Sequence, residues 1–515
     1  MSVPSPLAGL NVRDSLAAMD PRFAIQLDNF WPTGWGVFVR RGWSRWASLP
    51  TPVEVQSLLN YARTDGSENL FAVANDHKIY DVTLPTSSAP TVPYAPPVGP
   101  YVESVNFTNV FGTFLICVSG GATPFHYNGV TWAALNITGV IDDGPPVVDL
   151  DPADLVDVEV FKRRLWFVEK NSTRAWYLPT DSIQGVAELF DLGEVFPRGG
   201  YLAEIASWSV DTGEGLNDKL VFVSSEGDIA LFSGIDPDQD FSLDGLFRIG
   251  APINRRSAVK RGGDLVIATR EGVVSMAAVL QEQSEGGATT ITDVIKPLLS
   301  ALGNNLTNIE EWQLVMYNRI EMLLYNTSDS AGINAQYAMN TTTKAWTRFV
   351  NMLAKCWGVL EGVPHFGGAG YVARFWVGAK DGSTVDLVGG ETIQAQAIQA
   401  YSYFDSSGRQ KHWRMARPIL RGGSEPNVGI ALMVDYSSDN PTYALDPTPL
   451  GYGFGIWDVS YWDAALWGAN AIPFLRWYNV GAIGMAGAIA ISVKCATPDM
   501  AWISTDLVYE SGGVL

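Results

Sequence analysis

The chain of 515 residues has little cysteine, little histidine and few charged side chains. Its three cysteines (Cys117, Cys356 and Cys495) are far apart and form no Cys-x-x-Cys pair. This argues against a zinc site, a redox dithiol or a disulfide framework, and favours a reducing cytosol. None of the four histidines belongs to a His-Glu-x-x-His metal pair. Neither a Gly-x-Ser-x-Gly elbow nor a phosphate-binding P-loop occurs, so no nucleophile or nucleotide site is indicated.

Long apolar runs are also missing. No stretch of about 18 apolar residues is present, so we expect no membrane-spanning helix, and the first residues contain no apolar targeting segment. Charged residues make up only 17% of the chain and hydrophobic residues 47%, which is too apolar for a disordered protein. The net charge of −20 argues against specific nucleic-acid binding, because contacts with phosphates depend on Lys and Arg.

Aromatic and turn-forming residues are abundant. The chain contains 18 Trp, 19 Tyr and 22 Phe, together with 51 Gly and 29 Pro. Aromatic side chains suit the pleated surface of a sheet, whereas Gly and Pro favour turns. The composition therefore predicts an all-β protein with many tight connections.

A hairpin pattern recurs along the chain. Each copy has a short apolar run, a polar or Gly-containing turn and a second apolar run, and the last copy turns near Asp381 into Val385 and Leu387. The first runs are anchored by Leu70, Leu115, Leu165, Leu220, Leu265, Leu323 and Phe375, which follow one another at intervals of 45 to 58 residues. A period of roughly 40–50 residues with several short strands is typical of propeller blades. We therefore predict a β-propeller of six, possibly seven, blades; a β-sandwich with chance hairpins is the alternative.

The chain divides into three predicted parts. Residues 1–45 form an N-terminal arm that docks on a neighbour, or a strand that closes the ring. Residues 46–390 form the propeller, and residues 391–515 form a further β-rich domain with longer strands at 413–420, 428–436 and 488–494. Helix is scarce: residues 291–302 have helical apolar spacing, but Pro297 limits them to one short or kinked helix between blades.

Two acidic clusters are the candidate functional residues. One precedes the third hairpin, and the other resembles the start of a calcium loop but has Phe241 and Phe247 where such a loop needs Gly and Glu. The simplest interpretation is a solvated linker and turn. The alternative is an acidic patch facing a channel, made of Asp142, Asp143, Asp149, Asp151, Asp154, Asp157, Asp236, Asp238 and Asp240. We assign no catalytic residue, no metal ligand and no cofactor.

Three parts of the chain are similar to a known family. Residues 9–19 (GLNVRDSLAAM), 24–29 (AIQLDN) and 39–42 (VRRG) resemble the opening of tail proteins of short-tailed bacteriophages. Residues 247–252 (FRIGAP), 255–257 (RRS) and 262–265 (GGDL) resemble the middle of the same family, and residues 506–513 (DLVYESGG) resemble its C-terminus. This family is the tail hub or nozzle family, also described as packaged-DNA stabilisation proteins.

The resemblance implies a structural role. Such proteins form a ring, commonly a hexamer, that extends the tail tube, retains the packaged genome and passes DNA during ejection. The implied partners are other copies of the chain, the portal-adaptor protein, tail fibre or tail needle (plug) proteins, and double-stranded DNA that passes without specific binding. The protein would be assembled in the host cytoplasm and reside in the virion tail. Two alternatives remain: a tail adhesin or glycan-degrading propeller, and a cellular propeller scaffold that binds other proteins.

Overall fold

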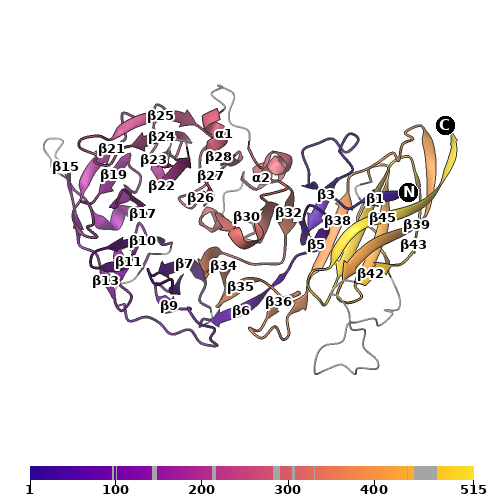
Figure 1. Ribbon diagram of the computed structural model, residues 1–515, viewed down its shortest axis with the longest axis horizontal. Helices are drawn as coiled ribbons and strands as arrows, with labels where there is room; N and C mark the ends of the chain where they lie inside the picture. Colours follow the sequence, from indigo (N-terminus) through magenta and orange to yellow (C-terminus); the bar gives the residue numbers. More distant parts are fainter. Residues whose placement is uncertain are drawn as a thin grey trace.

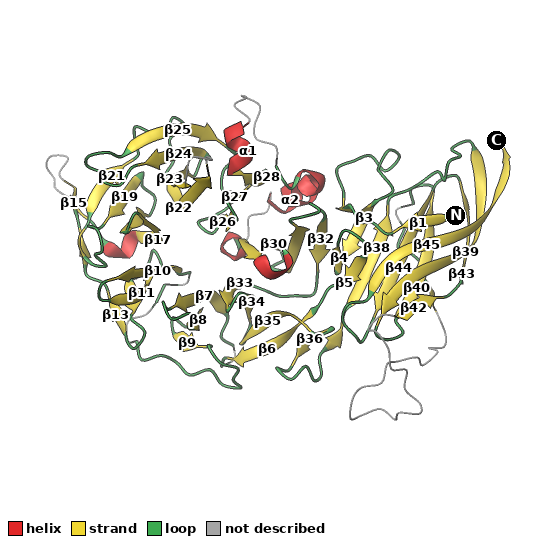
Figure 2. Cartoon of the chain, viewed as in Figure 1, coloured by secondary structure: helices red, strands yellow, loops and turns green. Residues whose placement is uncertain are grey.

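The computed structural model describes residues 1–514 except 51, 95–97, 100, 142–147, 212–215, 282–289, 304–307, 330, 438 and 446–471. Small sheets are arranged radially around a centre, and an elongated β-region lies beside this ring (Figure 1). Strands dominate and helices are few and short (Figure 2). Among the described residues, no helix is both long enough and apolar enough to cross a membrane. The predicted all-β propeller fold is confirmed.

Six blades are each built from one run of chain. Blade 1 is β7 (Val55–Ala62), β8 (Glu68–Ala74) and β9 (Ile79–Asp81), and blade 2 is β10 (Glu103–Asn109), β11 (Gly112–Val118), β12 (Phe125–Tyr127) and β13 (Trp132–Ala134). Blade 3 is β17 (Leu155–Phe161), β18 (Arg164–Glu169), β19 (Arg174–Tyr177) and β21 (Glu188–Asp191), and blade 4 is β22 (Leu202–Asp211), β23 (Leu216–Ser224), β24 (Asp228–Ser233) and β25 (Ser242–Arg248). Blade 5 is β26 (Ala258–Arg261), β27 (Asp264–Thr269) and β28 (Gly272–Ser275), and blade 6 is β29 (Gln313–Tyr317), β30 (Met322–Ser328), β31 (Asn334–Asn340) and β32 (Trp346–Phe349).

A closing blade combines two distant parts of the chain. It contains β33 (Cys356–Leu360), β34 (Val363–Gly368), β35 (Tyr371–Val377), β6 (Gly42–Ser48), β36 (Lys380–Ser383) and β37 (Glu391–Thr392), in that order. The innermost strands contact one another in sequence, from β7 through β10, β17, β22, β26 and β29 to β33, which returns to β7. β6 therefore joins the N-terminal segment to the last propeller strands and completes the ring.

The predicted hairpins are confirmed in the six single-run blades. Their anchors lie on the second strand of each blade and are at most 1% exposed: Leu70, Leu115, Leu165, Leu220, Leu265 and Leu323. The seventh prediction is wrong in detail, because Phe375 lies on a third strand, β35, and Val385–Leu387 form no strand. β6 pairs antiparallel with β35 and parallel with β36, so it occupies the place that the predicted hairpin partner would need.

The β-region beside the propeller is a sandwich of two sheets. One sheet contains β1 (Ser2–Pro4), β4 (Phe30–Pro32), β5 (Val37–Val39), β39 (Arg409–Gly422), β42 (Ile472–Leu475), β43 (Tyr478–Gly484) and β45 (Ala501–Val514). The other contains β2 (Gly9–Leu10), β3 (Phe23–Asp28), β38 (Gln394–Gln399), β40 (Asn427–Val434), β41 (Ala444–Leu445) and β44 (Gly487–Lys494). Buried side chains such as Phe30, Trp413, Ile491 and Trp502 fill one shared core. The longer strands predicted here match β39, β40 and β44.

The sandwich is continuous with the propeller. β32, the outer strand of blade 6, pairs in parallel with β2 and with β3, so that one ten-stranded sheet runs from β29 to β41. Gly9 permits this pairing, because its φ is +87° and an added Cβ would lie 2.5 Å from the Trp346 carbonyl oxygen. β1–β5 therefore belong to the sandwich, and β6, the strand that closes the ring, spans the predicted boundary at residue 45.

Short elements fill the connections. β14 (Ile137–Thr138) pairs with β20 (Gly185–Val186), and β15 (Val140–Ile141) pairs with β16 (Val148–Asp149). Helix α1 (Met276–Gln281) follows β28, and α2 (Lys296–Gly303) precedes β29. The predicted short helix is confirmed as α2, and Pro297 is its second residue, where the missing N–H has no intrahelical partner to lose.

Candidate functional site: the polar axis of the propeller

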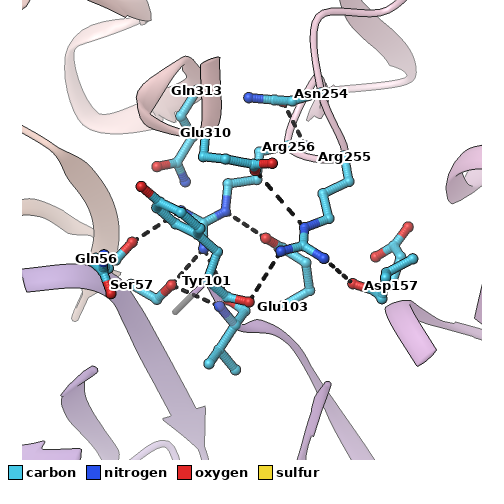
Figure 3. Close-up of polar contacts among 12 residues, drawn as sticks. Gln56, Ser57, Tyr101, Glu103, Asp157, Asn254, Arg255, Arg256, Glu310 and Gln313 are labelled. Atoms are coloured by element: carbon cyan, nitrogen blue, oxygen red, sulfur yellow. Dashed lines mark hydrogen bonds and ion pairs between the residues drawn. The ribbon is translucent and has the colours of Figure 1, made fainter. Parts of the chain in front are cut away.

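The centre of the ring is lined by polar side chains from the innermost strands of the blades. A cavity of about 190 Å³ is bordered by Glu103, Asp157, Glu204, Arg256 and Lys260 among others. A second cavity, of about 280 Å³, shares Glu103, Arg256 and two further residues with the first. Figure 3 shows how side chains from several blades converge here. We call this constellation the axial network.

Arg256 is the most connected member of the axial network. Its guanidinium forms an ion pair with Glu103 at the start of β10. It also donates to the Gln56 carbonyl oxygen (3.2 Å), to Ser57 Oγ (2.6 Å) and to the Val102 carbonyl oxygen (3.1 Å). The residue is 8% exposed and directly precedes blade 5. One side chain therefore ties blade 5 to blades 1 and 2 across the axis.

Arg255 links a different set of elements. Its two terminal nitrogens donate to the carbonyl oxygens of Val156 (3.3 Å) and Tyr101 (3.2 Å). Its Nε lies 4.0 Å from Glu310 Oε2. The two consecutive arginines thus point to different neighbours (Figure 3) and link separate elements through ion pairs and hydrogen bonds.

A polar residue latches one blade to the next at three equivalent positions. Ser57, Asp157 and Glu204 each directly follow a register shift near the start of an innermost strand. Each accepts a backbone N–H from the following blade or its entry: Val102 N to Ser57 Oγ (2.9 Å), Ile205 N to Asp157 Oδ2 (3.0 Å) and Ala258 N to Glu204 Oε1 (2.8 Å). The shift turns the side chain toward the neighbour, because a bulge re-aims the residue that follows it.

Burial changes the acidity of the two latch carboxyls. Loss of hydration raises the pKa of Glu204 to about 7, against hydrogen bonds from Ser257 and Ala258 that lower it. Burial likewise raises the pKa of Asp157 well above its usual value, and the nearby carboxylates of Glu103 and Glu204 add to this effect. A buried carboxyl without a paired cation favours its neutral form. The axial network therefore contains two carboxyls that hold protons more tightly than free Asp and Glu do.

The structure separates the residues of the predicted acidic patch. Asp157 lies on the axis, whereas Asp151 caps a short 3-10 helix by accepting from Ala153 N, and Asp149 and Asp154 are exposed. Asp142 and Asp143 lie outside the described residues. Asp236, Asp238 and Asp240 lie in the turn between β24 and β25. The described residues of the predicted patch therefore lie in different parts of the chain around blades 3 and 4, and their facing toward a channel stays a prediction.

The second acidic cluster is engaged in local contacts. Asp236 pairs with Arg164, and Asp238 accepts from the Tyr177 hydroxyl. Asp240 accepts the backbone N–H groups of Ile235 and Asp236. Among the residues that the structure describes, no group of three or more His, Cys, Asp or Glu is placed to hold a metal ion.

Sequence reasoning missed Ser57, Glu204 and the arginine pair as axial residues. A signal was available, because an apolar residue followed two positions later by a polar one recurs as Val55 and Ser57, Leu155 and Asp157, and Leu202 and Glu204. Arg255 and Arg256 belong to a segment that resembles the tail-protein family, but the sequence alone predicts no axial role for them. The apolar–polar alternation of a regular strand does not reveal these positions. A bulge adds one residue, so the side chains after it point to the opposite side of the sheet from the one that the alternation predicts.

The site uses its functional groups to hold blades together. The side-chain hydrogen bonds of Arg256, Ser57 and Glu204 go to backbone or side chains of neighbouring blades or their entry segments. The exposed tryptophans among the described residues, Trp35 and Trp477, lie at the sandwich rather than at this carboxyl-rich axis. These two tryptophans therefore do not lie beside the axial carboxyls.

Comparison with known proteins adds little to this picture. No protein-family model matches the chain, and no curated protein matches it. Among solved structures, the chain is similar to BBS1N in a crystal structure of its complex with ARL6DN, soaked with mercury. That match has 12% sequence identity and a TM-score of 0.39, and it covers 65% of this chain and 96% of the other.

Proposed function

We propose that the protein is a structural component of the tail of a short-tailed bacteriophage, forming the nozzle or hub ring that extends the DNA-conducting tube. The observation that carries this proposal is the axial network, which links several blades of the propeller. Arg255 and Arg256 bind side chains and carbonyl groups from several blades there. A propeller locked in this way serves as a rigid wall, and DNA would pass beside it, between subunits.

The charge distribution supports the same role. Residues 46–390 carry 40 Asp and Glu against 22 Lys and Arg, which accounts for most of the net charge of −20. A negative wall repels phosphates, so a passing duplex would not be held. The ten-stranded sheet that joins blade 6 to the sandwich also favours a wall, because it couples the two parts through backbone hydrogen bonds.

In this role the protein would have defined partners and a defined location in the virion. The ring would consist of copies of this chain, six in the family that it resembles. It would attach to the portal-adaptor protein on one side and to tail fibre or tail needle proteins on the other. It would reside in the virion tail, retain packaged DNA and pass it at ejection.

Electron microscopy of the purified protein, alone and mixed with its neighbouring tail proteins, tests this proposal. We expect closed rings with a central opening wide enough for a duplex. A chain that stays monomeric with those neighbours present and cleaves polysaccharide would overturn the proposal in favour of a glycan-degrading adhesin. Single particles that bind unrelated cellular proteins would overturn it in favour of a scaffold.

A further inference from the structure

The turn between β12 and β13 contains Asn128 followed by Gly129, the sole Asn-Gly pair of the sequence. Asn128 is exposed, and Gly129 has a φ of +90°. The backbone N–H of Gly129 has no hydrogen-bond partner among the residues that the structure describes. Because glycine has no side chain, its nitrogen is open to the side-chain carbonyl carbon of the asparagine before it.

The same turn polarises the side-chain amide of Asn128. Its Oδ1 accepts the backbone N–H groups of Val130 (2.9 Å) and Thr131 (2.8 Å). Its Nδ2 donates to Thr131 Oγ1 (3.2 Å). Two N–H donors on one carbonyl oxygen stabilise the negative charge that develops there when a nucleophile attacks the carbonyl carbon. The turn therefore favours attack on Cγ of Asn128 and holds a hydroxyl beside the nitrogen that would leave.

We propose that Asn128 is a site of spontaneous deamidation. The Gly129 nitrogen bonds to Cγ of Asn128, and the bond from Cγ to Nδ2 breaks. The proton lost from the Gly129 nitrogen is taken up by the departing NH2 group, which leaves as ammonia. Water then opens the resulting succinimide ring, adding its hydroxyl to one ring carbonyl carbon and a proton to the ring nitrogen. The product is aspartate or isoaspartate at position 128, whose carboxyl group ionises.

The conversion introduces a charge into an uncharged part of the propeller. Residues 104–141, which include all of blade 2 except Glu103, contain no Asp, Glu, Lys or Arg. The guanidinium of Arg63 donates to the Gly129 carbonyl oxygen (3.4 Å), so attraction between opposite charges favours the new carboxylate. Because ammonia is lost, the change is irreversible, and the fraction of charged molecules rises with the age of the protein.

Asn109, in the turn between β10 and β11 of the same blade, is a matched internal control. Its Oδ1 accepts the backbone N–H of Phe111 (2.8 Å), much as Asn128 Oδ1 accepts that of Val130. The residue after Asn109 is Val110, whose β-branched side chain shields the nitrogen that would attack. We therefore expect Asn109 to keep its amide where Asn128 loses it.

Peptide mass spectrometry of the intact chain, aged in its folded state at mildly alkaline pH, tests the proposal. We expect the mass change from amide to acid to accumulate at Asn128 and not at Asn109, with heavy oxygen from labelled water incorporated into the product. An Asn128 that keeps its amide until a synthetic peptide of residues 125–133 has lost its own would overturn the proposal. Equal conversion at Asn109 would overturn it as well.

Anion-exchange chromatography provides a second measurement. Aged wild-type protein should develop a later-eluting peak, because each converted molecule gains a negative charge. Asn128→Ser removes the amide and keeps a turn-forming residue, so this peak should not grow, whereas Asn128→Asp should elute there from the start. Gly129→Ala is less suitable, because an added Cβ would lie 2.9 Å from the Tyr61 hydroxyl. A late peak that grows equally in Asn128→Ser would overturn the proposal.

Discussion

Arg348 on β32 donates two hydrogen bonds, of 2.6 and 2.8 Å, to the carboxylate of Asp28 on β3. The two residues are 320 positions apart in the chain, and they face each other in the register that joins blade 6 to the sandwich. Asp28 is 6% exposed. This bidentate pair therefore secures the place where the two parts of the molecule share one sheet.

Removing one partner of this pair should weaken the junction. Arg348→Ala leaves the Asp28 carboxylate buried without its cation, and we expect the free energy of unfolding to fall by about 2 to 4 kcal/mol. Urea denaturation measures the change. The exposed pair of Arg22 and Asp20 is the control, because such pairs contribute about 0 to 1 kcal/mol. An Arg348→Ala loss no larger than that of Arg22→Ala would contradict the junction role.

Glu204 should make stability depend on pH. The folded state raises the pKa of Glu204 to about 7 from 4.5, so it keeps its proton to a higher pH than the unfolded chain does. The unfolded chain then binds fewer protons, and the free energy of unfolding falls as the pH rises from about 4.5 to about 7, by at most about 3 kcal/mol.

Glu204→Gln removes this proton linkage while it keeps a carbonyl oxygen for Ala258 N. Chemical denaturation at pH 5 and pH 8 should give a smaller difference for this variant than for the wild type. Asp157, whose pKa burial also raises, contributes in the same direction, so a residual slope is expected. A variant with an unchanged or steeper pH dependence would contradict the assignment.

Arg256 should be more important for stability than an exposed arginine. Arg256→Met removes the ion pair to Glu103 and the bonds to blade 1, and it leaves Glu103 without its cation. We expect a loss of about 3 to 5 kcal/mol in the free energy of unfolding. Arg163→Met is the comparison, because Arg163 has a side chain that is 67% exposed and pairs with Asp181 at the surface. Similar values for the two variants would show that the axial network does not lock the ring.

The hairpin anchors should respond differently from the wrongly predicted partner strand. Leu165 is fully buried, so Leu165→Ala should cost about 2 to 5 kcal/mol in thermal or chemical unfolding. Val385 is 41% exposed in a turn, so Val385→Ala should change the free energy of unfolding by less than about 0.5 kcal/mol. A large loss at Val385 would indicate that the chain pairs there after all.

Local patterns explain which parts of the fold could be predicted. The hairpins around Leu70, Leu165 and Leu220 involve neighbouring residues, so alternating apolar runs and Gly or Asn turns indicate them directly. The position of β6 depends on pairing with β35, more than 300 residues later, and no local pattern reports such a pairing. The pairing of β32 with β2 and β3, which joins blade 6 to the sandwich, also involves residues more than 300 positions apart. No local pattern predicts it either.

The axial network was only partly predictable. Asp157 was recognised as a candidate, but as one acidic residue among nine in the two clusters. Its partner in the next blade is a backbone N–H of Ile205, which has no signature in the sequence.

The pairing of β1 with β45 sets a condition on how the protein folds during synthesis. Ser2, Val3 and Pro4 pair with Asp506, Thr505 and Ser504, which lie about 500 residues later in the chain. The first strand therefore cannot pair until residues 504–506 have left the ribosome, and the sandwich cannot be completed earlier. Such long-range pairing slows folding and exposes unpaired strand edges meanwhile. In a cell that makes many copies at once, the yield of folded protein would depend on whether the unpaired β1 segment is kept from aggregating.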